Sequence, residues 1–177
     1  MQTSIVDVDF SENSLTSSNA NEMKFLSQVS GSVKYLKLSH YQLTRSLVDG
    51  VELSTFGSLR VLDLSYNQLS GPLSGFDYVY DLEIFRLGNN EFIWFLPNGL
   101  LKGETFVLNE LDLSANNLLR HIRLITLTTL RILNPSSNAI TGELPIGTFT
   151  HSNMLVDMYQ RKNFRSGVGF LHLPPYR

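Results

Sequence analysis

Hydrophobic residues recur along most of this chain in short groups that share one spacing. Each group holds an apolar residue, two variable residues, an apolar–variable–apolar triplet and, three residues later, an asparagine. The four clearest groups span Leu59–Gly71, Leu82–Phe92, Leu108–Leu118 and Leu130–Gly142. Alternation within the triplet is the period of a β-strand with one buried face. The pattern therefore predicts a series of short strands, each followed by a turn at the asparagine.

The full phrase, L-x-x-L-x-L-x-x-N-x-L, is the leucine-rich repeat, whose usual period is about 20–29 residues. Two weaker copies, Ile5–Leu15 and Val33–Leu43, continue the register towards the N-terminus, with Tyr41 in the place of the asparagine. The second framework residue recurs after 28, 26, 23, 26 and 22 residues, at Val8, Leu36, Leu62, Phe85, Leu111 and Leu133. We predict a leucine-rich-repeat solenoid of the α/β class. It would form a right-handed, β-solenoid-like horseshoe segment of mostly short parallel strands with an irregular convex side.

The repeat register also predicts where the strands lie and which residues form the core. The strands are expected at Lys34–Leu38, Val61–Leu64, Ile84–Leu87, Glu110–Leu113 and Arg131–Leu133. Stacked repeats bury their inward residues against one another. The leucines expected to be almost fully buried are Leu62, Leu64, Leu111 and Leu113. Each asparagine is expected to satisfy backbone groups inside its turn, and Tyr41, which cannot do so, is expected to distort the second repeat.

The pattern weakens at both ends of the chain. We divide the sequence into a degenerate first repeat with an insertion (1–32), plant-type repeats (33–147), and a degenerate repeat with an irregular tail (148–177). Met154–Met158 is a candidate seventh strand. Pro135 replaces an inward leucine and lacks a backbone donor, so the sheet is expected to weaken or stop near Leu133, with 148–177 poorly packed. Without recognisable capping units, the isolated chain is expected to be marginally stable or prone to aggregation.

Composition narrows the possible functions without selecting one. The chain has 177 residues, 42% of them hydrophobic and 17% charged, and a net charge of −2. These values fit a globular protein and give no sign of a nucleic-acid or membrane-surface partner. Cysteine is absent, the four histidines are scattered, and no residues form a set of nucleophile, base and metal ligands. We expect neither enzymatic activity nor a cofactor. Neither a signal peptide nor a membrane-spanning run is visible, so the chain as written is expected to be soluble.

The residues after the asparagines carry a family resemblance. Thr141–Pro145 follows the plant form of the repeat, Ser/Thr-Gly-x-Leu/Ile-Pro, and the chain resembles the ectodomains of plant leucine-rich-repeat receptor-like kinases. More narrowly, Gly75–Asn90 and Leu96–Gly103 resemble the guard-cell hydrogen-peroxide-resistance receptor-like pseudokinase group. The resemblance implies a partial ectodomain at the extracellular face of the plasma membrane, acting in signal perception. The family's transmembrane helix and kinase-like domain are not found in this sequence.

The outward positions of the strands are the candidate site. In such solenoids these positions line the concave face, which generally binds peptides or protein partners. The candidate residues are Tyr35, Lys37, Val61, Asp63, Ile84, Arg86, Glu110, Asp112, Ile132 and Asn134. One interpretation is a docking surface for a peptide ligand or a protein co-receptor. The alternatives are a solvated sheet face whose charges maintain solubility and, for the whole chain, a truncated, degenerate fragment with no independent function.

Overall fold

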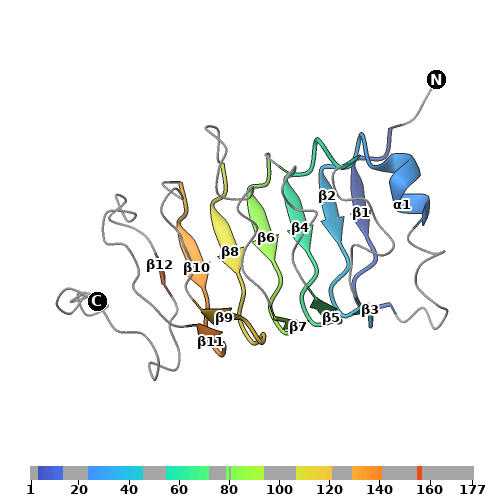
Figure 1. Cartoon of the computed structure of the whole chain (residues 1–177). Coiled ribbons are helices and arrows are strands. Elements are labelled where there is room, and N and C mark those ends of the chain that lie inside the picture. The colour runs from blue at the N-terminus through green and yellow to red at the C-terminus, as the bar shows by residue number, and fades with distance from the viewer. Residues whose placement is uncertain are drawn as a thin grey trace.

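A computed structural model describes residues 4–13, 24–45, 55–71, 79, 81–93, 107–120, 129–140 and 155–156. Its main feature is a sheet of seven short strands, stacked in chain order from the N-terminal to the C-terminal end of the molecule (Figure 1). The strands are β1 (Asp7–Asp9), β2 (Tyr35–Lys37), β4 (Val61–Asp63), β6 (Ile84–Arg86), β8 (Glu110–Asp112), β10 (Ile132–Asn134) and β12 (Leu155–Val156). One turn of the solenoid thus contributes one strand, as the repeat pattern predicts.

All pairs in this sheet are parallel and in the register of the repeat. Leu36 pairs with Leu62, Leu62 with Phe85, and Phe85 with Leu111. The five predicted strands are confirmed, with bounds that differ by one residue at some ends. The candidate strand Met154–Met158 is confirmed at Leu155–Val156, which pairs with β10.

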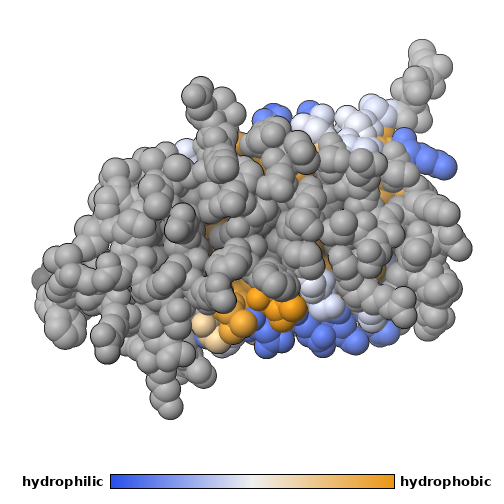
Figure 2. Space-filling model, viewed as in Figure 1, coloured by the Kyte–Doolittle hydropathy of each residue, from blue (hydrophilic) through white to orange (hydrophobic). Residues whose placement is uncertain are grey.

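A second set of short strands lies after the turns. Parallel pairing joins β3 (Thr44–Arg45), β5 (Gln68–Gly71) and β7 (Glu91–Phe92), and separately joins β9 (Leu119–Arg120) and β11 (Ala139–Ile140). The described residues contain one short helix, α1 (Lys24–Val29). Part of the chain expected to be irregular is therefore ordered by neighbour-to-neighbour pairing. In this second set Phe92 is buried, while Ile93 and Leu119, next to strands β7 and β9 or within them, are exposed. Figure 2 shows hydrophobic colour at the lower edge of the molecule, where Figure 1 places β7 and β9.

The core is one column of leucines with aromatic residues between them. Leu62, Leu64, Leu111 and Leu113 are each 0% exposed, which confirms the predicted core. Phe85 replaces a leucine in the same column and is equally buried. A single buried cluster runs from Val8 to Leu133, so each repeat shields the inward side chains of its neighbours.

A ladder of asparagines joins neighbouring repeats behind the sheet. The Asn90 side chain donates from Nδ2 to the Leu87 and Gly88 carbonyls of its own turn and to the Leu64 carbonyl of the preceding repeat. Its Oδ1 accepts a hydrogen bond from the Leu69 backbone N–H of that preceding repeat. Asn67, Asn116 and Asn138 make the equivalent set of bonds. The predicted role of the asparagines is confirmed, and it extends across the boundary between repeats.

Tyr41 interrupts this ladder, and its repeat is distorted as predicted. The residue before each framework asparagine has a positive φ, and His40, before Tyr41, follows that rule. Gln42, directly after Tyr41, adds a second left-handed residue with φ of 59°. The residues directly after Asn67, Asn90, Asn116 and Asn138 do not have a positive φ. Tyr41 is buried, and its ring lies 6.3 Å from that of Phe10. Aromatic packing thus replaces the amide bonds between the first two repeats.

The prediction that the sheet weakens or stops near Leu133 is wrong in its stronger form, because β12 pairs with Ile132 and Leu133 of β10. Pro135 is buried after β10, outside the paired residues. Earlier repeats use this position for one more bond, from Leu113 N to Asn134 O for example. Because proline has no backbone N–H, Pro135 cannot make this one bond, and the paired residues of β10 keep theirs. The remainder of 148–177 lies outside the described residues.

Candidate functional site

The ten candidate residues form two adjacent columns on one face of the large sheet, which we call the outer sheet face. The middle residue of each strand is buried, so the residues on either side of it point away from the core. The first column is Tyr35, Val61, Ile84, Glu110 and Ile132. The second column is Lys37, Asp63, Arg86, Asp112 and Asn134. The structure therefore brings all ten together, as the sequence predicts.

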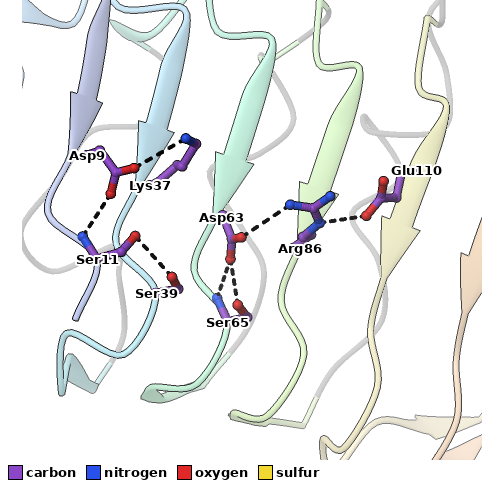
Figure 3. Close-up of polar contacts among 8 residues, drawn as sticks. All are labelled: Asp9, Ser11, Lys37, Ser39, Asp63, Ser65, Arg86 and Glu110. Atoms are coloured by element: carbon purple, nitrogen blue, oxygen red, sulfur yellow. Dashed lines mark hydrogen bonds and ion pairs between the residues drawn. The ribbon is translucent and has the colours of Figure 1, made fainter.

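The second column and Glu110 carry a ladder of alternating charge (Figure 3). At the N-terminal end, Lys37 Nζ lies 3.2 Å from Asp9 Oδ2. Further along, Arg86 Nη1 lies 3.5 Å from Asp63 Oδ2, and Arg86 Nε donates to Glu110 Oε1 over 2.6 Å. Arg86 thus bridges a carboxylate on β4 and another on β8.

Arg86 is the centre of the more enclosed part of this ladder. Its hydrogen bond to Glu110, and then the charges of Glu110 and Asp63, raise the pKa of the Arg86 guanidinium above its usual value despite partial burial. The Asp63 side chain is only 13% exposed. Asp63 is therefore less accessible to a partner than its outward position suggests.

Arg86→Gln tests the contribution of this bridge to stability. The substitution removes the cation between two partly buried carboxylates, and we expect the free energy of unfolding to fall by about 1 kcal/mol, since the guanidinium is partly solvated. Urea denaturation followed by circular dichroism measures the change. Arg131→Gln is the matched control, because Arg131 is exposed and has no ion pair among the described residues. Equal losses in both variants would contradict a structural role for the bridge.

Acidic and amide residues of the second column also hold the turn that follows each strand. Asp63 Oδ1 accepts hydrogen bonds from the backbone N–H and the hydroxyl of Ser65. Asp112 and Asn134 each accept a bond from the backbone N–H two residues later, and so does Asp9, the register partner of Lys37 on β1. At Asp9 this backbone bond from Ser11, together with the Ser11 side chain and the hydrogen bond and charge of Lys37, lowers the carboxyl pKa below its usual value. The predictions from the repeat pattern did not include these turns, although the spacing Asp/Asn-x-Ser in the sequence is a signal for them.

The first column supplies apolar surface. Tyr35 and Ile132 are 38% and 39% exposed, and Val61 and Ile84 are half-buried. Glu110 lies between Ile84 and Ile132, so the apolar positions are divided by a carboxylate.

An aromatic pair at the end of the strands was also not predicted. The rings of His40 and Tyr66 stack with centroids 4.2 Å apart and planes at 10°. Both residues occupy the left-handed position of the turn, and Tyr66 is 53% exposed. Hydrophobic periodicity contains no information on this position, because its side chain faces solvent.

Neither a metal site nor a membrane span is found in the described part of the chain. There, no three His, Cys, Asp or Glu side chains are grouped so as to hold a metal ion. Its helical segment also lacks the length and apolar character of a membrane span.

Comparison with known proteins agrees with this architecture. The leucine-rich-repeat family model matches residues 58–77. The receptor-like serine/threonine-protein kinase GHR1 of Arabidopsis thaliana is 53% identical over 71% of this chain. A probable inactive receptor kinase of the same plant is 35% identical over 70% of the chain. The matched region spans only 12% of the length of each relative.

Among solved structures, a plant peptide hormone receptor, RGFR1 in complex with RGF2, superposes with a TM-score of 0.68. It is 29% identical in sequence, and the match covers 84% of this chain and 22% of that chain. The chain is thus a leucine-rich-repeat domain of the solenoid class. Within that class it is similar to plant leucine-rich-repeat receptor kinases, GHR1 among them.

Proposed function

We propose that this chain is a protein-recognition segment of a receptor ectodomain at the extracellular face of the plasma membrane. Its outer sheet face would bind an extended peptide or a protein co-receptor in signal perception. The main support is the alignment of exposed apolar side chains with a partly compensated row of charges on one open face. A peptide ligand is further supported by the structural similarity to RGFR1, a plant peptide hormone receptor in complex with RGF2.

Binding, rather than catalysis, is the role that these side chains fit. The charged groups are paired with one another or hydrogen-bonded to backbone, and the apolar side chains beside them are partly exposed. Large apolar side chains supply binding energy at protein interfaces, while surrounding charges set specificity and association rate. The same arrangement fits either an apolar-anchored peptide or a co-receptor surface.

Selection of peptides from a displayed library against the whole 177-residue chain tests the proposal. Selected peptides should bind the wild type, and Ile84→Glu and Ile132→Glu should each weaken them by about tenfold or more, as expected for a buried contact made charged. Gln68→Glu, an exposed position on β5, is the matched control and should bind normally. Circular dichroism would verify that each variant is folded.

Two results would contradict the proposal. Equal binding by the Ile84, Ile132 and Gln68 variants would place recognition away from the outer sheet face. Failure to select any peptide, together with no binding to a receptor-kinase co-receptor ectodomain, would favour the degenerate fragment with no independent function.

A further inference from the structure

On the outer sheet face, Asp112 is a carboxylate that forms no ion pair with any described residue. In its column, Arg86 lies between Asp63 and Asp112, which are its register partners on β4 and β8. The guanidinium bonds to Asp63 and to Glu110, and no ion pair with Asp112 forms within 4.0 Å. The register partner on the other side, Asn134, carries no charge. Among the described residues, Asp112 therefore has no cationic partner.

The surroundings of Asp112 leave one of its carboxylate oxygens available. Oδ1 accepts the backbone N–H of Ser114, whereas no described group donates to Oδ2. Asp63 differs, because its Oδ1 is bonded to the Ser65 hydroxyl and its Oδ2 faces Arg86. The Asp112 side chain is half-buried, so it is held against the sheet while part of it stays open to solvent.

Gly88 explains how Asp112 is placed. In the other repeats the corresponding residue is serine: Ser11, Ser39, Ser65, Ser114 and Ser136. A Cβ at Gly88 would lie 3.1 Å from Asp112 Oδ2 and 2.8 Å from Ser114 Oγ. The φ of Gly88 is not in the left-handed region, so its backbone can accept serine. The absence of a side chain at 88 thus makes room for the Asp112 carboxylate and the Ser114 hydroxyl to lean over β6.

We propose that Asp112, with Ser114 beside it, is a subsite for a basic side chain, arginine or lysine, of the peptide that the outer sheet face binds. The proposal rests on the function proposed above and adds the chemistry of the partner. Charge complementarity supports it, because an added cation continues the alternation of charges in the second column. Ile84 and Ile132 lie on the neighbouring strands about 8 Å from Asp112, from the strand spacing and a two-residue offset. An extended peptide would therefore place an aliphatic side chain on the same side as the basic one, two residues away.

Peptide selection on the wild type, followed by matched substitutions, tests this subsite. Selected peptides should be enriched in arginine or lysine at one position. Replacing that arginine by citrulline, which has similar shape but no charge, should raise Kd about 2- to 5-fold, the size of a partly exposed ion pair. Asp112→Asn should cause a similar rise for the arginine peptide and little further change for the citrulline peptide. Glu91→Gln, an exposed charge on β7, is the control and should leave both values unchanged.

Gly88→Ser supplies a second, conservative variant, since serine is the residue of the other repeats. It should fold normally and lose most of the preference for arginine over citrulline, because the new side chain displaces the Asp112 carboxylate. Peptides that bind well, respond to Ile84→Glu and show no preference for a basic residue would overturn the subsite and leave the proposed function standing. Failure to select any peptide would overturn the subsite, and if no receptor-kinase co-receptor ectodomain bound either, the proposed function would fall with it.

A small probe gives an answer that does not depend on peptide binding. N-acetyl-argininamide should shift the side-chain carboxyl ¹³C signal of Asp112 more than those of Asp63 and Glu110, whereas N-acetyl-citrullinamide should shift none of them. Equal shifts at all three carboxylates would show general attraction of cations and would also overturn the subsite.

Discussion

Leu111→Ala is expected to lower the free energy of unfolding by about 2–5 kcal/mol, the range for truncating a buried leucine. Leu111 is 0% exposed and lies in register between Phe85 and Leu133 on the adjacent strands. Because two neighbouring repeats hold the walls of the site, the lost side chain leaves a cavity that cannot easily collapse. Urea denaturation monitored by circular dichroism measures the change.

Val107→Ala is the matched control for this prediction. Val107 immediately precedes the same repeat and is 41% exposed, so its truncation is expected to change stability by no more than about 0.5 kcal/mol. A change of that small size at Leu111 would instead show that the inward column is not closely packed.

Asn116→Ala is expected to cost about 2–4 kcal/mol, although its side chain contributes little to hydrophobic burial. The Leu87, Leu113 and Ser114 carbonyls that Asn116 bonds also accept hydrogen bonds from Asn90, Asn138 and the Asn89 backbone. The Phe92 backbone N–H, in contrast, donates to Asn116 Oδ1 in a buried position. The substitution leaves this donor without a described partner, and an unsatisfied buried donor is the main source of the cost.

Asn117→Ala isolates this effect, since Asn117 is the next residue along the chain and is exposed. Its side chain makes no described hydrogen bond, and its loss is expected to be within about 0.5 kcal/mol of neutral. Amide hydrogen exchange adds a positional check: in Asn116→Ala the Phe92 amide should exchange faster than in the wild type. Unchanged protection there would mean that another acceptor had replaced Oδ1.

The sequence identifies the strands and core because one spacing repeats with little error. Leu62, Leu111 and their equivalents must share a face when an apolar residue recurs at the same point of each repeat, and that constraint survives the change from leucine to Phe85. The asparagine column is equally visible. The pattern does not show where strand pairing ends. The position of Pro135 is evident from the sequence, but only the structure shows that its nitrogen lies after the paired residues of β10.

The candidate site is predictable as a set of positions and less so as a set of interactions. Alternation assigns Asp63, Arg86 and Asp112 to one exposed column. Alternation does not predict with which of the carboxylates of Asp63, Glu110 and Asp112 the Arg86 guanidinium pairs, because the pairing depends on the rotamers of side chains on neighbouring strands. The burial of Asp63 and the open side of Asp112 follow from this choice. The contribution of Gly88 is hidden for a similar reason, since a missing side chain has no effect on hydrophobic periodicity.

The asparagine ladder gives the solenoid a direction, because a repeat donates side-chain hydrogen bonds to the repeat before it and accepts them from the repeat after it. The side-chain amide of each later framework asparagine donates to a carbonyl of the preceding repeat, so the turn of one repeat is completed by the repeat that follows; this holds for Asn67, Asn90, Asn116 and Asn138. A gene duplication that adds a whole repeat among the later ones would preserve these hydrogen bonds, because the new repeat contains both an asparagine and a turn that accepts the next asparagine. The second repeat accepts the Asn67 side-chain amide in its turn. With Tyr41 at its own asparagine position, it supplies no side-chain amide to the first repeat. Each exact copy of the second repeat would therefore add a boundary between repeats that lacks the asparagine hydrogen bonds, whereas copies of the later repeats would keep them.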